Sequence, residues 1–151
     1  MILRDSISVK AGAEAIFRFF EEMEGNYRRW HPDHVVFRWI SGRGVKEGNV
    51  FYFEEYIAGK LLKKRVVFTR VIPNQHIEFA PTFRLMKFFL PCMLFRVEPE
   101  SDGCQFIAEV HLRMGPLARW AHKKELEAIR EHMRVESVNI KRIVEQQQQQ
   151  V

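Results

Sequence analysis

The sequence predicts an α+β fold in which a curved antiparallel sheet wraps around a long C-terminal helix. The chain opens with an alternating apolar and polar segment, followed by an amphipathic helical segment. A series of alternating segments separated by turn residues fills the middle, and a long helical pattern closes the chain. Strands that are grouped in sequence and followed by a helix are typical of the α+β class. We therefore expect a single domain over residues 1–145 and a low-complexity tail over residues 146–151.

The first part of the chain predicts one strand and one or two helices. Residues 2–10 alternate between apolar and polar side chains, which indicates a half-buried strand. Residues 13–23 carry apolar side chains at helical spacing, and Glu24-Gly25-Asn26 is expected to end that helix. A short helical turn is expected to follow through Tyr27 and Trp30.

The middle of the chain predicts the remaining strands, arranged as an antiparallel run. Each segment alternates in hydrophobicity and is rich in aromatic and β-branched residues, and turn-forming residues separate the segments. The expected strands cover residues 35–40, 49–58, 61–72, 77–80, 93–98 and 105–114.

Residues 82–94 carry more large apolar side chains than a plain loop needs, and Pro81 and Pro91 bound most of them. One interpretation is a short helix or lid over the mouth of a cavity. Ordinary core filling is an alternative, and an exposed patch that touches a membrane is the third.

The closing helix is expected from about Leu117 to about Glu145. Gly115-Pro116 precedes it, and proline suits a first helical turn because its missing N–H needs no partner there. One apolar stripe should face the core, and the same spacing places His132 and Glu136 on the buried face. A buried carboxylate needs a partner or a cation, because its desolvation costs several kcal/mol. The stripe contains Trp120, Ala121, Ile129, Met133, Ile140 and Ile143.

The strand predicted over residues 49–58 carries an inward-facing carboxylate. Side chains alternate between the two faces of a strand, and Glu55 is in phase with Phe51 and Phe53. We therefore expect Glu55 to point into the interior and Glu54 to point to solvent.

Three parts of the chain carry side chains suited to one metal site. His31 and His34 flank a proline, Glu55 is expected to face the interior, and the closing helix supplies His132 and Glu136. Imidazole nitrogens and carboxylate oxygens are usual ligands of zinc, and also of iron or manganese. Each motif alone also fits ordinary surface histidines and solvent-exposed ion pairs, so the metal site depends on all three parts meeting.

The chain resembles the START/Bet v 1-like (SRPBCC) helix-grip superfamily over nearly its whole length. The resemblance lies in the strand-then-helix opening, the meander, the long closing helix, and Ile77-Glu78-Phe79 after Val71-Ile72-Pro73-Asn74. It implies an apolar cavity between sheet and helix, which such proteins use for lipids, polyketides, hormones or aromatic substrates. The fold alone does not choose among these ligands.

Within that superfamily, the motifs look like those of the phloretin hydrolase and diacetylphloroglucinol hydrolase family. The similarity lies in residues 27–34 together with Glu55 and the pair His132-x-x-x-Glu136. It implies zinc and the hydrolysis of a carbon–carbon bond between a phenolic ring and an acyl group. His34 would lie beside the metal and contact the substrate or transfer a proton. The implied ligand set is His31, Glu55, His132 and Glu136.

Two functions of different classes follow from these observations. The first is a metal-dependent hydrolase that acts on a small aromatic or polyketide-like ketone bound in the cavity. The alternative is a metal-free binding or transport domain for a hydrophobic small molecule or lipid. A structural or regulatory partner module is a third interpretation.

Composition and charge limit the expected cellular location and the classes of binding partner. The net charge is +5, but no dense stripe of lysine and arginine with interleaved aromatics is present, which argues against nucleic-acid binding. Cys92 and Cys104 have neither disulfide nor zinc-ribbon spacing, so a reduced, cytoplasmic location is expected. No apolar run is long enough to form an integral membrane segment. The sequence does not decide whether the chain forms a homodimer.

Overall fold

The computed structural model describes residues 1–150 as one antiparallel sheet with five helices. The strands are β1 (Ile2–Val9), β2 (His34–Ser41), β3 (Val50–Ile57), β4 (Lys60–Ile72), β5 (His76–Pro81), β6 (Cys92–Glu100) and β7 (Gly103–His111). The helices are α1 (Ala13–Glu21), α2 (Met23–Trp30), α3 (Arg84–Phe89), α4 (Pro116–Ala121) and α5 (Lys123–Gln149). The seven strands pair in the order β1-β7-β6-β5-β4-β3-β2, and every neighbouring pair is antiparallel.

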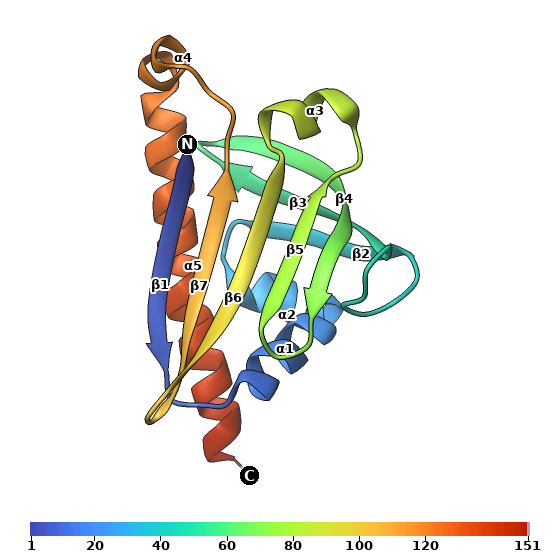
Figure 1. The fold of residues 1–151 in the computed structure, drawn as a ribbon, viewed down its shortest axis with the longest axis vertical. Helices are drawn as coiled ribbons and strands as arrows, with labels where there is room; N and C mark the ends of the chain where they lie inside the picture. The colour runs from blue at the N-terminus through green and yellow to red at the C-terminus, as the bar shows by residue number, and fades with distance from the viewer. Residues whose placement is uncertain (151) are drawn as a thin grey trace.

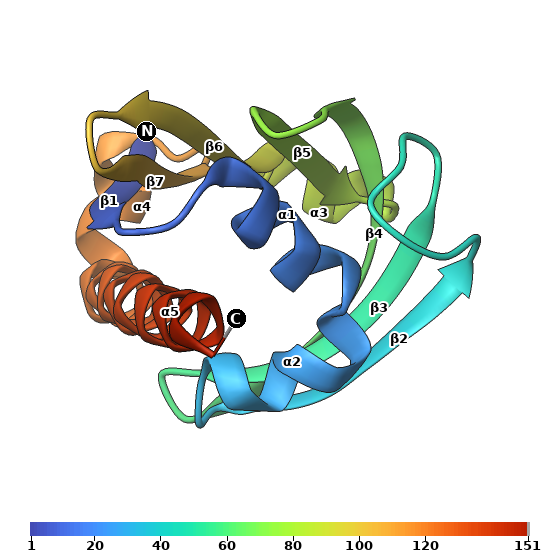
Figure 2. The same cartoon turned by 90° about the horizontal axis from the view of Figure 1, so that it is seen from below.

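The sheet curves around α5 as the sequence predicted (Figure 1). Figure 2 shows the strands as an arc with β1 near one end and β2 at the other, while α5 lies across the open side. The connection from β1 to β2 runs through α1 and α2, which cross the arc. The concave face of the sheet and the inner faces of these helices therefore supply the core.

Aromatic side chains dominate this core. Phe20 of α1 stacks on Phe95 of β6 with ring centroids 4.8 Å apart, and Phe95 stacks on Phe106 at 5.4 Å. Trp30 of α2 packs edge-on against Phe19 and Phe20 at 5.6 and 5.5 Å. Such pairs add about 0.5–1.5 kcal/mol each beyond the area they bury. They fix α1 and α2 against the sheet.

The apolar stripe of α5 is confirmed over most of its length. The spacing that buries these side chains also buries His132 and half-buries Glu136, as predicted. The stripe members that are buried or partly buried are Ile129, Met133, Ile140 and Ile143.

The closing segment is two helices, not the single helix predicted from Leu117. α4 ends at Ala121, and His122 leaves the helical region with φ −106° and ψ 25° before α5 begins at Lys123. Trp120 and Ala121, which the stripe assigned to the core, are both exposed. The prediction was wrong there because a helical stripe keeps its direction only while the helix is continuous.

The N-terminal helices also break at a different point from the one predicted. α1 ends at Glu21 and α2 begins at Met23, so Gly25 lies inside a helix and does not end one. Asn26, interpreted as part of a stop signal, has another role. Its Nδ2 donates a hydrogen bond of 2.9 Å to the carbonyl of Phe19, near the end of α1, where helix carbonyls lack intrahelical partners.

The glutamine tail begins as a continuation of α5. The helix extends to Gln149, beyond the expected end of the domain at Glu145. Glutamine is a good helix former, so the solvent-exposed end can remain helical without packing. Val151, the last residue of the predicted tail, lies outside the described residues.

Residues 82–94 form α3 and the beginning of β6. The short-helix interpretation is confirmed, whereas core filling is wrong for the helix, because none of its side chains is buried. Leu90 and Met93, which follow it, are buried. Within the described residues, no helix is both long and apolar enough to cross a membrane.

Candidate functional site

An apolar cavity of about 170 Å³ lies between the concave sheet face and the helices. Most of its lining is aromatic or aliphatic, which is usual for sites that bind small molecules. The polar lining residues include Glu55, Lys64, His132 and Glu136, so one part of the wall is charged. The aromatic lining residues are Phe20, Tyr27, Trp30, Phe37, Trp39, Phe51, Phe53, Phe68, Phe79 and Phe95.

The predicted orientation of the two adjacent glutamates is confirmed. Glu55 is buried and lines the cavity together with Phe51 and Phe53. Glu54 is on the opposite face of β3, where it accepts a hydrogen bond of 2.8 Å from the hydroxyl of Tyr52. The strict alternation of a strand sets both orientations.

Two histidines and two glutamates meet where α5 faces β2 and β3, and we call them the His/Glu cluster. The Nε2 atom of His34 lies 3.1 Å from His132 Nε2, 3.6 Å from Glu55 Oε2 and 3.2 Å from Glu136 Oε2. The Nε2 atom of His132 lies 3.1 Å from Glu55 Oε2 and 3.6 Å from Glu136 Oε1. Each of these nitrogens therefore faces both carboxylates.

Regular secondary structure positions all four side chains. His34 and Glu55 are register partners in the β2–β3 pair, so their side chains share one face of the sheet. His132 and Glu136 are one turn apart on α5 and project from the same helix face. The side chain of Trp30 donates a hydrogen bond of 3.0 Å to the carbonyl of Glu136, which attaches α5 to the end of α2.

Backbone hydrogen bonding fixes the tautomer of His34. Its Nδ1 lies 2.8 Å from the carbonyl oxygen of Tyr27, and a carbonyl can only accept, so Nδ1 carries the proton. In the neutral ring, Nε2 then presents its lone pair to the cluster. The ring also stacks on Tyr27 with centroids 4.0 Å apart, which holds its plane.

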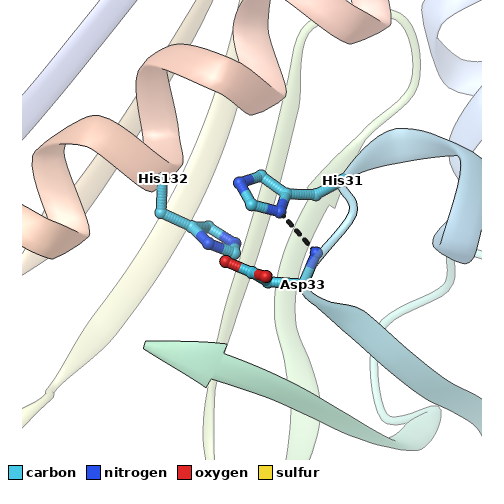
Figure 3. Close-up of side chains that lie close together, drawn as sticks. All are labelled: His31, Asp33 and His132. Atoms are coloured by element: carbon cyan, nitrogen blue, oxygen red, sulfur yellow. Dashed lines mark hydrogen bonds between the residues drawn. The ribbon is translucent and has the colours of Figure 1, made fainter. Parts of the chain in front are cut away.

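His31, which the sequence placed among the metal ligands, lies beside the cluster and not in it. Its ring stacks on His132 with centroids 3.9 Å apart, and its Nδ1 accepts a hydrogen bond of 2.9 Å from the backbone N–H of Asp33 (Figure 3). Neutral His31 therefore carries its proton on Nε2, and neither nitrogen has a free lone pair. His34 is thus the second histidine whose ring faces the two carboxylates, while His31 lies with Asp33 and His132 in a neighbouring group. The assignment of His31 as a metal ligand stays a prediction.

Burial and ion pairing act in opposite directions on the pKa values of the cluster. Burial raises the pKa of Glu55, but the hydrogen bond with His132 and the charge of Lys64 outweigh it, so this pKa lies below its usual value. Burial lowers the pKa of His132, but the hydrogen bond with Glu55 and the charge of Glu136 bring it above its usual value. Without a cation, Glu55 and His132 therefore favour the charged pair.

Sequence reasoning missed Lys64. Its Nζ lies 3.7 Å from Glu55 Oε1, on the side of the carboxylate away from the histidines. The signal was available, since Lys64 is in phase with the buried residues Val66 and Phe68 of β4 and so shares their inward face. An inward lysine next to an inward glutamate on the paired strand marks a polar part of the cavity wall.

Tyr27 is a buried phenol next to the cluster. Its hydroxyl donates a hydrogen bond of 3.2 Å to the carbonyl of Glu54. Burial and the nearby charges of Glu55 and Glu136 raise its pKa far above the usual value for tyrosine. Tyr27 therefore stays neutral and acts as a hydrogen-bond donor.

Three members of the cluster, His34, Glu55 and His132, have donor atoms close enough together to hold one divalent cation. Zinc binds nitrogen and oxygen at about 2.0–2.2 Å, so the ligand atoms of a tetrahedral site lie about 3.3–3.6 Å apart. Among His34, Glu55 and His132 the donor atoms lie 3.1–3.6 Å apart. Glu136 lies 3.2 Å from His34 through Oε2 and 3.6 Å from His132 through Oε1. Two carboxylates would balance the charge of the cation, and the bond from His34 Nδ1 to a backbone carbonyl is the usual support of a metal-bound histidine. Metal binding itself stays a prediction.

Solved structures with the same fold come from bacteria and plants. Protein NE0264 from Nitrosomonas europaea has a TM-score of 0.74 and 12% identity, over 98% of this chain and 96% of that one. The Zhui aromatase/cyclase from Streptomyces sp. R1128 has a TM-score of 0.71 and 11% identity, over 96% and 93%. The ginseng major latex-like protein 151 from Panax ginseng has a TM-score of 0.71 and 10% identity, over 93% and 95%. These similarities confirm the predicted helix-grip, Bet v 1-like fold.

Comparison with known sequences assigns the family. No curated protein matches the chain. None of the similarities described here supports the resemblance to the phloretin and diacetylphloroglucinol hydrolases, which stays a prediction. One family model matches residues 2–145, nearly the whole described chain. The chain therefore belongs to the family described as polyketide cyclase / dehydrase and lipid transport.

Proposed function

We propose that this chain binds a hydrophobic small molecule of about one aromatic ring in its cavity, with the polar group of the ligand at the His/Glu cluster. The observation that carries this proposal is an apolar cavity of about 170 Å³ whose wall includes Glu55, His132 and Glu136. Apolar protein cavities of about 150 Å³ bind benzene, so one ring with a short substituent suits this volume. The family description, which spans polyketide cyclases and lipid transport, supports a hydrophobic ligand.

Calorimetric titration with 4-hydroxyacetophenone, a one-ring phenolic ketone, tests this binding. Ala108 is buried and lines the cavity, so Ala108→Phe fills the space and should weaken binding at least tenfold. Ala121→Phe, at an exposed position on α4, makes the same chemical change outside the cavity and should bind as the wild type does.

Two results would overturn the binding proposal. One is a wild-type protein that does not bind 4-hydroxyacetophenone; binding of stearic acid alone, in a parallel titration, would replace the one-ring ligand by a long-chain lipid. The other is a folded Ala108→Phe protein, verified by circular dichroism, that binds as tightly as the wild type.

A second function, metal-dependent hydrolysis of the bound ligand, is favoured by the geometry of the His/Glu cluster. His34, Glu55, His132 and Glu136 would hold the cation, which when bound supplies Lewis acidity and a water of lowered pKa. The protein itself contributes the aromatic walls that orient a ring, and the charge of Lys64, which favours ionised Glu55. In a hydrolysis, water gives its hydroxyl to the acyl carbon and its proton to the ring carbon as the bond between them breaks.

That His34 transfers a proton stays a prediction. The contacts of both its ring nitrogens argue against this role. The role needs a free imidazole beside the cation. In the structure the His34 Nδ1–H is bonded to a carbonyl, and Nε2 faces the two carboxylates. His31 has the position outside the cluster that was expected for His34.

Incubation of zinc-loaded and chelator-treated protein with diacetylphloroglucinol tests the hydrolase proposal. Zinc-dependent release of acetic acid that Glu136→Gln abolishes, while 4-hydroxyacetophenone still binds, would support it. If the zinc-loaded protein binds the ligand and releases no acid, hydrolysis is excluded for this substrate class and the binding function stands alone.

A further inference from the structure

One end of the molecule carries an exposed surface that the proposed function does not use. Residues 82–89, which include α3, form one part of it, and residues 113–124, which include α4, form the other. Figure 1 shows α3 and α4 at the same end, opposite α1, and both are behind the core in Figure 2. We call this the α3–α4 surface.

The apolar side chains of the α3–α4 surface are unusually exposed. Six of the twelve exposed large hydrophobic residues within residues 1–150 lie on it. A folded monomer rarely exposes such a concentration of apolar side chains unless they form an interaction site. The six are Phe83 (65% exposed), Leu85 (61%), Phe88 (52%), Phe89 (51%), Leu117 (77%) and Trp120 (77%).

The charge of the α3–α4 surface has a single sign. Its two segments carry six lysines and arginines, all exposed, and contain no aspartate or glutamate. Because the whole chain has a net charge of +5, the remaining residues together carry a net charge of −1. The excess positive charge of the protein is therefore concentrated among its most exposed apolar side chains. The six cations are Arg84, Lys87, Arg113, Arg119, Lys123 and Lys124.

Direct contacts join the two parts of the α3–α4 surface. The backbone N–H of Arg113 donates a hydrogen bond of 2.8 Å to the carbonyl of Phe89. The guanidinium of Arg113 lies over the ring of Phe88, 4.6 Å from its centroid. The end of α3 and the segment that leads into α4 therefore form one continuous surface.

We propose that the α3–α4 surface docks on an anionic phospholipid bilayer. Exposed phenylalanine, leucine and tryptophan side chains insert at the boundary between headgroups and acyl chains, and lysine and arginine pair with anionic headgroups. A second copy of this chain is a poorer occupant. In a symmetric dimer the same patch would face itself, so its six cations would meet six like charges. The adjoining carboxylate of Glu125, which lies 3.9 Å from His122, is too little to offset them.

The α3–α4 surface lies next to the cavity, so docking would bring the cavity close to the membrane. Leu90 and Leu112 line the cavity, and they directly adjoin the two segments of the surface in sequence. A protein docked through this end would present the nearby cavity wall to the bilayer, where hydrophobic molecules dissolve. Docking goes beyond the proposed ligand binding, and its test does not require the ligand to be known.

Flotation with extruded vesicles of phosphatidylcholine containing 30% phosphatidylglycerol, compared with pure phosphatidylcholine, tests the docking. The wild type should float with the anionic vesicles, and raised salt should reduce this binding. Arg84→Glu/Lys87→Glu should lower the bound fraction at least tenfold, and so should Phe88→Ser/Phe89→Ser. Trp120 should show a blue-shifted emission and less acrylamide quenching with anionic vesicles, and Trp120→Phe should lose that change.

A charge-matched control separates docking from simple attraction of a basic protein. Arg18→Glu/Lys46→Glu makes the same change in charge at exposed positions on α1 and on the β2–β3 loop, and should keep most of the binding. Equal losses in the two charge variants would overturn the proposal. It would also be overturned if the folded wild type failed to float, or if light scattering showed a dimer that Phe88→Ser/Phe89→Ser dissociates.

Discussion

At the scale of single residues, hydrogen bonds decide which histidine can face the His/Glu cluster. Both Nδ1 atoms form a hydrogen bond with the backbone. Nδ1 of His34 donates to a carbonyl at 2.8 Å, whereas Nδ1 of His31 accepts from an N–H at 2.9 Å. This reverses their tautomers, so the neutral His34 ring offers a lone pair at Nε2 and the neutral His31 ring offers a proton there. A sequence motif that contains both histidines carries no information about this difference.

We predict that His34→Ala removes stoichiometric zinc and that His31→Ala does not. The loss in His34→Ala should exceed the factor of about 10–100 typical of residues that only support a ligand. Elemental analysis of protein purified without chelator, followed by competition with a zinc-binding dye, measures both. The opposite result would restore His31 to the ligand set that the sequence suggested.

The buried thiol of Cys104 gives a prediction about the pH dependence of its alkylation. Burial, with the charges of Glu100 and Glu14, raises the pKa of Cys104 to about 11. The reactive thiolate is then roughly 0.3% of the total at pH 8.5. Alkylation of Cys104 by iodoacetamide should keep accelerating above pH 9 in the folded protein. In urea at pH 8.5 about half of the thiol is ionised, so alkylation should be roughly 150-fold faster from the thiolate fraction alone. Mass spectrometry of the alkylated peptides measures the rates, and a plateau below pH 9 would contradict this assignment.

At the scale of elements, α5 shows where helical periodicity correctly predicts buried side chains and where it fails. The stripe correctly predicted the buried face that holds Met133 and Ile140, because helix geometry fixes which side chains share a direction. It failed at Trp120, since the break at His122 redirects α4 and no residue there signals a stop. Strand alternation was similarly sufficient to orient Glu55.

We predict that Ile140→Ala destabilises the protein by about 2–5 kcal/mol, because its side chain is fully buried in the stripe. Val138→Ala, on the exposed side of the same helix, should change the free energy of unfolding by less than about 0.5 kcal/mol. Urea unfolding followed by circular dichroism measures both variants. Similar values for the two would mean that the buried face of α5 has been misplaced.

At the scale of the whole molecule, the general architecture followed from sequence but the detailed surroundings of the site did not. The order of strands and helices indicated a curved sheet around a helix, and the structure has that arrangement. The assembly of His34 with Glu55 depends on the β2–β3 register, and that register includes irregularities that alternation alone does not reveal. The exposure of α3 likewise depends on packing that its apolar composition argued against.

We predict that zinc stabilises the whole domain through the cluster. Free zinc at 100 times its dissociation constant should raise the free energy of unfolding by about 2.7 kcal/mol, if the unfolded chain does not bind it. Glu136→Gln should lose most of this gain. Thermal unfolding scans with zinc and with chelator measure the difference, and equal midpoints for the wild type under both conditions would argue against a metal site.

The strand order also constrains how this domain folds during synthesis. Within residues 1–150, the first strand, β1, pairs only with β7, and Ile2 lies opposite His111. The first strand therefore has no partner until most of the chain has left the ribosome. Contacts between such distant residues close slowly, because the entropy of a long loop is lost before the contacts form. We expect the nascent chain to expose the apolar face of β1 for most of translation. During that time the nascent chain depends on chaperones for protection from aggregation.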